Sequence, residues 1–584
     1  MVDSRLLTAG IVVVIAVVAL LVGFSFIYGS SDEADAEPDT VEEFTPPDPE
    51  TMPGVLDAEH NEFAGFEDVA VEAGLEYEVV DHGIPLVVDN SGAYVVDFTN
   101  DGYEDLLLIG GEKPTLFENI GGEYVPAQEF DHPHAMVAHF FDYNNNGYQD
   151  LAIADFGGSL VLYENVGGEF VERPDAFPSV SLSYPTTMTA ADVTDNGCLD
   201  VYVGNWAGPF SQQPMSLEEF ATVAAHHPEA RPSTETGGAN ALYAGDCESF
   251  EEIAEDAGVA GSEYTLAVSA ADVTGNGHVD LHVGNDFTAD HLYENRGGGD
   301  FEKIDMGPAS DRNAMSSAVA DLTGDHRLDI FVTNVYFHDP PPGTDLVQVV
   351  NVPLPYGNNL FANQGGGEFV DVAPDHGLHA GSWGWSATVA DYTNDGHLDV
   401  IHASMYVNPT IVADQPETFR TLQAWKGTGT SWEKVDGVEL GFSNHNLRGV
   451  VRIDYQNDGV LDLVAVDNPS TPAVSGTERG GNSTHLYENT LDSEDSLQLW
   501  IRNDHGIDRN AGVYVETDER TIYREANSRG DLLSQDSRLI HVGTKNEVVE
   551  RVIVQWPDGT ENIYDDLSSG NRYILTPDGF EVID

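Results

Sequence analysis

The chain has 584 residues, 101 of them acidic and 23 basic, which gives a formal net charge of −78. A hydrophobic fraction of 41% is sufficient for a folded core, so the composition excludes a disordered acidic polymer. Nucleic acid is excluded as a partner, because phosphate binding needs a basic face. Self-repulsion on this scale is largely screened at molar salt, where the Debye length is about 3 Å. The surface is therefore typical of a halophilic protein; an acidic, calcium-rich secreted protein is the alternative.

The N-terminal region combines an apolar run with an acidic spacer. Residues 6–27 carry no charge and would form a helix about 33 Å long, enough to span a bilayer. Arg5 precedes the run and acidic residues follow it, which places the N-terminus inside and the bulk of the chain outside. We predict a signal anchor at 1–29 and a single-pass cell-membrane protein, with a cleaved signal peptide as the alternative. The acidic, proline-bearing residues 30–62 are predicted to be a disordered linker.

A nine-residue stretch then recurs seven times, most clearly from Asp391 to Asp399. Oxygen side chains fall at positions 1, 3, 5 and 9, and glycine at position 6 permits the reversal that returns position 9 to a bound ion. Calcium takes six to eight oxygen ligands, so the pattern predicts calcium loops. Strand-like residues follow each loop and no glutamate stands at the twelfth position, which excludes EF-hands.

The predicted ligands are four in each loop: Asp97, Thr99, Asp101 and Asp105; Asp142, Asn144, Asn146 and Asp150; Asp192, Thr194, Asn196 and Asp200; Asp272, Thr274, Asn276 and Asp280; Asp321, Thr323, Asp325 and Asp329; Asp391, Thr393, Asp395 and Asp399; and Asp454, Gln456, Asp458 and Asp462. We therefore expect up to seven calcium ions, bound more tightly by loops with three aspartates than by loops with two. The Asp321 loop has His326 in place of glycine, so its ion is expected to be weak or absent.

A second motif, Leu-Tyr-Glu-Asn followed by Gly-Gly and an aromatic residue, tracks the first and predicts a β-hairpin. The longer steps between repeats carry insertions near 205–241, 336–358 and 405–421. The array begins with an isolated end of this unit at Phe66 and finishes with an isolated beginning at Leu486. Joined, these pieces complete a seventh unit and leave no exposed sheet edge. We predict an all-β fold with a seven-bladed β-propeller at 63–492.

Residues 493–584 contain short strand-like runs and are predicted to be a separate small β domain. Within it, Ser534 to Gly543 gathers polar groups at no catalytic spacing that we recognise. The two cysteines, Cys198 and Cys247, fall in one repeat. They either form a disulfide, as an extracytoplasmic chain permits, or are two small buried hydrophobic residues.

These motifs resemble a known family. The repeats resemble FG-GAP/VCBS repeats, which also build the heads of integrin α-subunits. The C-terminal region resembles the ASPIC/UnbV domain, and the combination is similar to the cartilage acidic protein-like family in its halophilic prokaryotic form. Residues that carry the domain resemblance are Arg524 and Glu525, Leu533 to Gln535, His541 to Gly543, and Val554 to Gly559. The resemblance implies calcium at the matching loop positions and an adhesion or extracellular matrix context.

The sequence thus predicts a membrane-tethered, extracellular, non-catalytic module that binds a protein or glycan. The alternative is a propeller enzyme that acts on polysaccharide through paired carboxylates in its central pocket. No nucleophile elbow, zinc-protease motif or phosphate loop is present. The histidine groups His132, His134 and His139, and His226 and His227, are interpreted as structural rather than catalytic. Insertions bearing Trp206, Tyr336 and Pro340 are expected to cover one face and bind ligand, with neutral decoration as the alternative.

Overall fold

The computed structural model describes residues 63–80, 91–178, 182, 184–206, 238–286, 288–335, 357–404, 422–443, 445, 447–468, 484–492, 495–503, 506–507, 510–526, 530–557 and 559–583. The predicted anchor and linker, at 1–29 and 30–62, lie outside this part of the chain. Among the described residues, no helix has the length and apolarity needed to cross a membrane.

Strands dominate the described residues, and most of them belong to seven four-stranded antiparallel units. The units are β2 (Gly92–Val96) to β3 (Asp105–Ile109), β4 (Thr115–Asn119) and β5 (Tyr124–Glu129); β6 (Ala135–Phe141), β7 (Asp150–Asp155), β8 (Leu160–Asn165) and β9 (Phe170–Arg173); β10 (Pro185–Ala191), β11 (Asp200–Asn205), β12 (Ala241–Gly245) and β13 (Phe250–Glu252); β14 (Tyr264–Ala271), β15 (Asp280–Asp286), β16 (His291–Asn295) and β17 (Phe301–Ile304); β18 (Ser316–Ala320), β19 (Asp329–Thr333), β20 (Asn359–Asn363) and β21 (Phe369–Asp371); β22 (Gly384–Ala390), β23 (Asp399–Ser404), β24 (Leu422–Gly427) and β25 (Trp432–Val435); and β26 (Leu447–Ile453), β27 (Asp462–Asp467), β28 (Thr484–Asn489) and β1 (Phe66–Asp68). Short helices α3 (Ala254–Ala257), η5 (Pro308–Ser310) and α5 (Ala373–His376) follow or precede outer strands.

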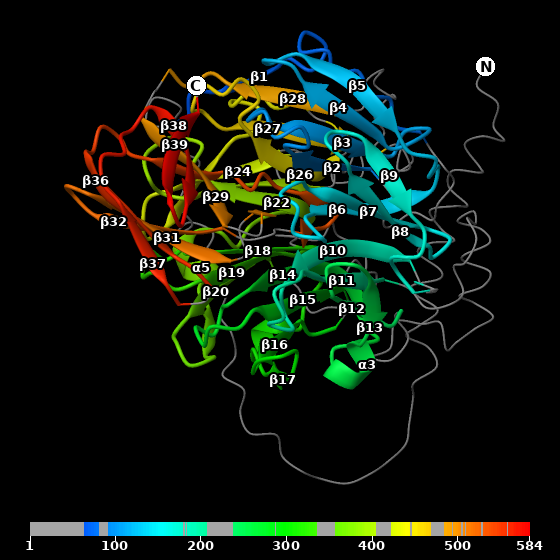
Figure 1. Cartoon of the computed structure of the whole chain (residues 1–584). Coiled ribbons are helices and arrows are strands. Elements are labelled where there is room, and N and C mark those ends of the chain that lie inside the picture. The colour runs from blue at the N-terminus through cyan, green and yellow to red at the C-terminus, as the bar shows by residue number, and fades with distance from the viewer. Residues whose placement is uncertain are drawn as a thin grey trace, which may run out of the picture.

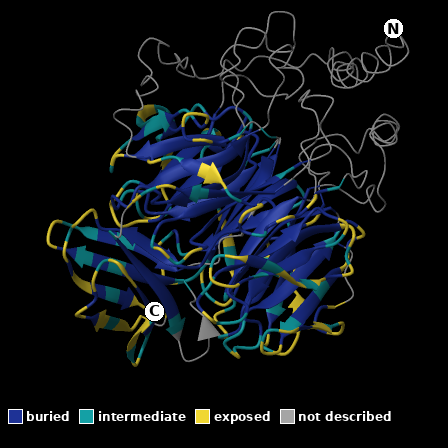
Figure 2. Ribbon diagram, turned by 90° about the horizontal axis from the view of Figure 1, so that it is seen from above, coloured by how far each residue is buried: buried dark blue, intermediate teal, exposed yellow. Residues whose placement is uncertain are grey.

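The first strands of successive units pack against one another in order, from β2 to β6 and onward to β26, which packs back against β2. The last unit is completed by the first strand, since β1 pairs with β28 in an antiparallel register that sets Phe66 opposite Asn489. The result is a propeller-like ring (Figure 1), and the predicted all-β fold is confirmed. Dark, buried residues fill the sheets, while exposed residues gather on the turns at their ends (Figure 2).

Inner strands are buried on both faces, which explains their near-continuous apolar runs. The strands β2, β6, β14, β22 and β26 have no exposed residue. Each has neighbouring units on both sides, so it lacks the alternation of apolar and polar residues expected of a half-exposed strand. The hydrophobic clusters accordingly span adjacent units rather than filling one unit each.

The C-terminal region forms its own two sheets around a separate hydrophobic core. One sheet holds β29 (Ser496–Asn503), β30 (Gly506–Ile507), β35 (Ile540–Gly543), β38 (Asn571–Thr576) and β39 (Gly579–Ile583). The other holds β31 (Ala511–Thr517), β32 (Thr521–Ala526), β36 (Val549–Gln555) and β37 (Glu561–Tyr564). Two further short strands, β33 (Gly530–Asp531) and β34 (Ser534–Gln535), leave this domain and join the propeller sheet beside β2.

Cys198 and Cys247, which are 49 positions apart in sequence, form a disulfide with 5.3 Å between their Cα atoms. The bridge ties the loop between β10 and β11 to the turn between β12 and β13. The sequence left open a disulfide or two small buried hydrophobic residues, and the structure has the disulfide.

Candidate functional site

The seven predicted calcium loops, here called the Asp loops, lie on one face of the ring. Each connects the first and second strands of a unit, and its position 9 is the first residue of the second strand. The shared connection explains why the nine-residue pattern recurs, because every loop must make the same reversal between antiparallel strands. The structure thus places all predicted ligands in equivalent positions around the face.

Position 1 of each Asp loop caps the turn of its own loop. In the clearest copy, Asp391 Oδ1 accepts a hydrogen bond from the Asp395 N–H (3.1 Å) and Oδ2 accepts one from the Gly396 N–H (2.7 Å). The Asp321 loop makes the same pair of bonds at 3.1 Å each, although His326 replaces glycine and takes φ +64°. The loop geometry therefore survives the substitution that the sequence treats as disruptive.

Position 9 ties the loop to the rest of its unit. Asp399 Oδ2 accepts a hydrogen bond from the Tyr392 N–H (2.9 Å), and Oδ1 accepts one from the Gly427 N–H at the end of the third strand (2.8 Å). Burial, reinforced by repulsion from other loop aspartates, raises the pKa of Asp105 to about 9 and that of Asp150 to about 8. The loops therefore hold close carboxylates that would be stabilised by a cation.

The donor set of these loops fits calcium in its chemistry. At position 3, Thr99 Oγ1 and Thr393 Oγ1 are buried and have no hydrogen-bond partner. A buried hydroxyl without a partner is costly unless something else occupies its lone pairs. The loop aspartates beside each hydroxyl supply the remaining hard oxygen ligands that calcium prefers.

Two asparagine positions outside the predicted ligand set join neighbouring units. Position 4 of four loops is an asparagine at φ +53° to +60° whose side-chain amide reaches the next loop, as in Asn100 Nδ2 to the Gly147 carbonyl (3.0 Å). The equivalent bonds start from Asn145, Asn394 and Asn457. The recurrence of asparagine at position 4 is the signal that could have revealed this role, since asparagine tolerates the left-handed conformation.

The asparagine of the Leu-Tyr-Glu-Asn motif makes a second link between units. Asn119 Nδ2 donates to the Tyr455 carbonyl (2.8 Å) and to the Glu104 carbonyl (3.2 Å). Equivalent bonds to position 2 of another unit's loop start from Asn165, Asn295, Asn363 and Asn489. The motif is therefore both a hairpin and an attachment between units.

The C-terminal domain covers part of the loop face and brings arginines to it. Arg572 Nη2 lies 2.9 Å from Asp454 Oδ2, and both side chains are buried. Arg502 approaches Asp97 at 3.9 Å. Arg524 lies near enough to the first aspartates of two further loops to oppose the rise in their pKa that burial causes, at Asp321 and Asp391.

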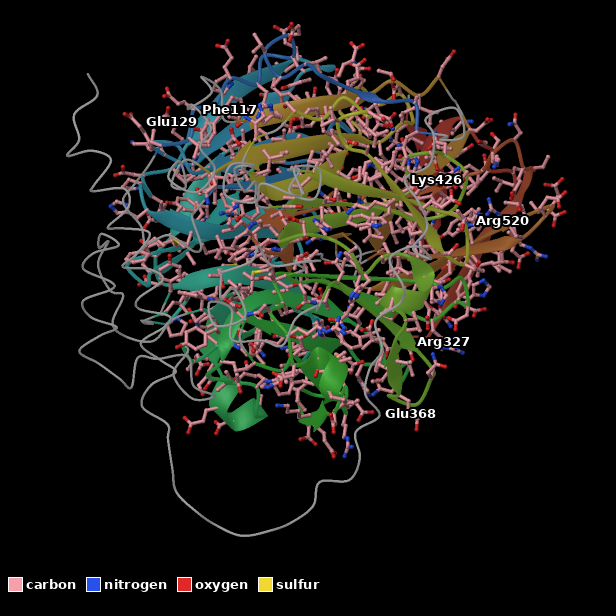
Figure 3. The ribbon with its side chains drawn as sticks, turned by 180° about the vertical axis from the view of Figure 1, so that it is seen from behind. Phe117, Glu129, Arg327, Glu368, Lys426 and Arg520 are labelled. Atoms are coloured by element: carbon pink, nitrogen blue, oxygen red, sulfur yellow. A yellow bond between two sulfur atoms is a disulfide. The ribbon has the colours of Figure 1, made fainter. Side chains whose placement is uncertain are left out.

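These four loops are adjacent around the ring, and they are the ones with aspartate at position 5: Asp101, Asp325, Asp395 and Asp458. The other three have asparagine there. In Figure 3, Lys426 and Arg520 lie on the same side of the molecule, and both reach Asp395, Lys426 Nζ at 3.5 Å from its carboxylate and Arg520 Nη2 at 2.6 Å from its carbonyl. The four loops that carry a third aspartate, at position 5, are therefore the ones that face basic side chains, mostly from the C-terminal domain.

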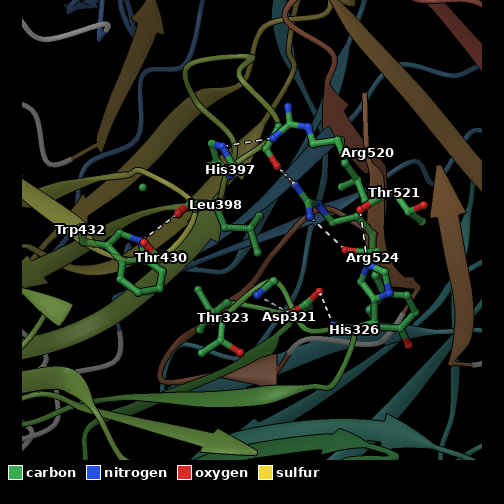
Figure 4. Close-up of a pocket in the computed structure, with 17 residues that line it drawn as sticks. Asp321, Thr323, His326, His397, Leu398, Thr430, Trp432, Arg520, Thr521 and Arg524 are labelled. Atoms are coloured by element: carbon green, nitrogen blue, oxygen red, sulfur yellow. Dashed lines mark hydrogen bonds between the residues drawn. The ribbon is translucent and has the colours of Figure 1, made fainter. Parts of the chain in front are cut away.

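A cavity of about 260 Å³ lies where the Asp321 and Asp391 loops meet β32 (Figure 4). His326, His397, Arg520 and Arg524 contribute to its lining, together with Asp321. Arg524 Nη2 donates to the Gly396 carbonyl (3.2 Å), and Arg520 Nη1 lies 3.1 Å from His397 Nε2. Both arginines in this cavity thus serve the contact between the two domains.

Residues 530–539, here called the central segment, enter the middle of the ring. Leu532 and Leu533 are fully buried (0% exposed) in a cluster with propeller residues such as Trp385. β33 packs against β10, β14 and β18, and β34 packs against β2, β6 and β26. A Cβ on Gly92 would lie 2.3 Å from the Leu533 carbonyl oxygen, so only glycine fits this approach.

Polar groups of the central segment also bond to inner strands, among them β22, the one inner strand not yet named. Gln535 makes two bonds with the Phe140 backbone of β6, accepting from N–H (2.7 Å) and donating to the carbonyl (2.9 Å). Asp536 accepts from the Arg452 N–H (3.0 Å) in β26 and from Thr388 Oγ1 (3.1 Å) in β22. Every inner strand therefore contacts this segment, which fills the axis of the ring.

The remaining residues named from the sequence are the histidine groups and the residues of the insertions, and the structure describes only some of them. His132 bonds Tyr163 through Nε2 (2.8 Å), and His139 is fully buried, where burial holds its pKa well below the ordinary value. His226 and His227 lie outside the described residues. Trp206 was expected in an insertion that covers one face, but it is buried: its ring is tilted against that of Tyr184 and edge-on to that of Tyr264, with centroids 5.7 and 5.5 Å away. Most of the insertions, including Tyr336 and Pro340, fall outside the described residues.

The architecture and the loops define a class, a propeller of FG-GAP-like repeats followed by a separate C-terminal domain. The FG-GAP-like repeat model matches residues 142–203, 272–332 and 344–402. The ASPIC and UnbV model matches residues 502–581. The chain carries both elements, so the resemblance to FG-GAP-like repeats and to the ASPIC/UnbV domain is confirmed, while the halophilic prokaryotic form stays a prediction.

Among individual proteins, the chain is similar to cartilage acidic protein 1 of Mus musculus, with 24% identity over 431 residues that make up 72% of this chain. It spans 59% of that relative's length. Among solved structures, an Agrocybe aegerita lectin that recognises non-reducing terminal N-acetylglucosamine has a TM-score of 0.37 at 17% identity, covering 69% of this chain and all of that one. BBS1N in complex with ARL6DN has a TM-score of 0.37 at 10% identity, covering 70% of this chain and 95% of that one.

Proposed function

We propose that this protein is a membrane-tethered, extracellular, seven-bladed propeller that binds a protein or glycan ligand without transforming it, and that calcium in the Asp loops stabilises it. The combination of FG-GAP-like repeats with an ASPIC and UnbV domain supports an extracellular ligand-binding module. The apolar, uncharged run at 6–27 supports the membrane anchor.

The observation that carries the non-catalytic part of the proposal is the filled axis. The buried leucines at 532 and 533, and the bonds made by Gln535 and Asp536, occupy the place where a central pocket would lie. A polysaccharide chain has no access to paired carboxylates there while the central segment is in place. The enzyme alternative therefore loses the site on which it depends.

The face opposite the Asp loops is the better candidate for ligand binding. The longest connections join the second and third strands of four units, leaving after Asn205, Thr333, Ser404 and Asp467. Because these strand ends all point away from the Asp loops, the connections begin and end on that face. Long connections on a rigid ring are where binding residues are commonly found.

Calcium would be held by aspartate carboxylates and by position 3 hydroxyls such as Thr393 Oγ1. Bound ions would neutralise the repulsion among loop carboxylates and add stability that grows with the logarithm of the calcium concentration, about 2.7 kcal/mol per site at a concentration 100 times Kd. At the Asp454 loop, Arg572 already supplies a positive charge to position 1. We therefore expect that loop to bind more weakly than its three aspartates alone suggest.

Two measurements on the detergent-solubilised full chain in molar salt test the proposal. Calcium added after chelation should raise the melting temperature. Thr393→Val, which removes the hydroxyl, should reduce this rise, whereas Thr393→Ser, which keeps the hydroxyl, should not. Replacing residues 207–237 with a short Gly-Ser linker should abolish binding to arrayed extracellular proteins and glycans without lowering the melting temperature. A melting temperature indifferent to calcium would refute the ion-binding part, and release of cleaved sugars would refute the non-catalytic part.

A further inference from the structure

The geometry points to a second metal site, built from His445, Asp467 and His485 and suited to Zn²⁺ or a similar transition metal. These residues lie on the face opposite the Asp loops, before β26, at the end of β27 and at the start of β28. All three belong to the unit that closes the ring, which also contains β1. The site is independent of the proposed calcium loops, which hold oxygen ligands only.

Within the part of the chain that the structure describes, this is the one group of three histidine, cysteine or acidic side chains whose ligand atoms all lie within 4.8 Å of one another. His445 Nδ1 lies 3.1 Å from Asp467 Oδ2, and His485 Nε2 lies 3.9 Å from the same oxygen. Ligand atoms around a tetrahedral zinc at about 2.0–2.1 Å are roughly 3.3 Å apart. The observed separations lie on either side of that value, so small side-chain rotations would complete the coordination.

The environment of His485 favours metal binding through Nε2. Its other nitrogen, Nδ1, lies 2.7 Å from Asp68 Oδ2, which fixes the ring orientation and the proton position. The side chain is 6% exposed, yet Nε2 has no hydrogen-bond partner, and neither has Asp467 Oδ1. A carboxylate behind a ligating histidine, with the remaining nitrogen left open, is the usual arrangement at protein zinc sites.

The competing interpretation is an ion pair in which a proton takes the place of the metal. Burial lowers the pKa of His485, but the attraction of the neighbouring Asp467 and Asp68 carboxylates outweighs burial and raises the pKa to about 9. A protonated His485 between two carboxylates would satisfy the charges without a metal. An ion pair alone does not require a second imidazole, yet the His445 ring lies beside that of His485, with centroids 4.2 Å apart and the ring planes tilted by 48°.

Two imidazoles and one carboxylate provide three ligands and leave one position for water or a fourth group. Asp68 belongs to β1, whereas the ligands lie in β27, in β28 and just before β26, so a bound metal would fasten the first strand to the last unit. The site would thus stabilise closure of the ring. It would also place an open coordination position on the proposed ligand-binding face.

The test is zinc and cobalt binding by the metal-stripped full chain, with excess calcium present to occupy oxygen sites. We expect one Zn²⁺ retained per chain after dialysis, and Co²⁺ absorption bands typical of nitrogen and oxygen ligands in a four-coordinate site. His445→Gln should abolish both, and Asp68→Asn should weaken affinity 10- to 100-fold while leaving all three ligands in place.

The matched control is His132→Gln. His132 occupies the equivalent place in another unit, 3.9 Å from Asp155, but its third neighbour is Tyr163 rather than a second histidine. This variant should bind zinc as the unaltered chain does. Failure of the unaltered chain to retain zinc, or equal binding by His445→Gln, would overturn the inference in favour of the ion pair. If His445→Gln does not fold, Asp467→Asn and the cobalt spectrum of the unaltered chain decide the question.

Discussion

Leu533 provides the sharpest test of how the two domains are joined. Its side chain is fully buried at the axis of the ring, and its backbone takes φ +54° at the tip of the hairpin formed by β33 and β34. Leu533→Ala removes a buried isopropyl group but keeps the Cβ and therefore the same backbone strain. Large-to-small substitutions of this kind destabilise by about 2–5 kcal/mol, depending on how far the surroundings collapse.

A second variant separates packing from strain. Leu533→Gly removes one more carbon, which adds to the packing loss, but it relieves a left-handed conformation that costs an L-residue roughly 1–2 kcal/mol. The two effects oppose each other, so we expect the glycine variant to be no less stable than the alanine variant by more than about 1 kcal/mol. Without the positive φ, glycine would be clearly the worse of the two.

The assay is urea unfolding in molar salt, followed by tryptophan fluorescence and by limited proteolysis of the C-terminal domain. Val548→Ala, at a residue 62% exposed in the same domain, is the control and should change stability by less than about 0.5 kcal/mol. A loss below about 1 kcal/mol for Leu533→Ala, or proteolysis unchanged from the control, would refute the placement of this segment in the ring axis.

Three further predictions concern the joints between units, the domain contact and pH. Asn119→Ala should lower stability by about 1–3 kcal/mol, since it leaves the buried Tyr455 carbonyl without its donor; calorimetry showing no loss would contradict the linking role. Arg572→Met should cost about 3–5 kcal/mol because it leaves the Asp454 carboxylate buried and unpaired, and adding Asp454→Asn should restore part of that loss in urea unfolding with chelator present. Burial lowers the pKa of His402 to about 3, so the folded state keeps it neutral while the unfolded chain binds a proton below about pH 6.5. Stability from this residue is therefore complete above that pH and falls by about 1.4 kcal/mol per unit below it, and the stability difference between the unaltered chain and His402→Gln should shift by that amount between pH 6 and pH 5.

The sequence alone was sufficient for features whose causes lie within a few residues. A reversal between two strands needs a capping aspartate and a residue that accepts positive φ, and both fall inside one nine-residue loop, so seven copies were visible by repetition. The same holds for the hairpins, and for ring closure, where the partial units at Phe66 and Leu486 complement each other; their strands β1 and β28 do pair. The Asp321 loop shows the limit of this reasoning, because His326 adopts the left-handed conformation that glycine would take.

Only the tertiary structure decided the contacts between residues far apart in sequence. Arg572 meets Asp454, Leu533 enters the ring axis, and Asp68 reaches His485, in each case through the packing of whole strands and domains. No spacing in the chain marks these pairs, because loop lengths between them do not restrict which surfaces come together. The calcium pattern is a property of local chain geometry, whereas the filled axis and the histidine–aspartate group depend on the closed ring that brings their residues into contact.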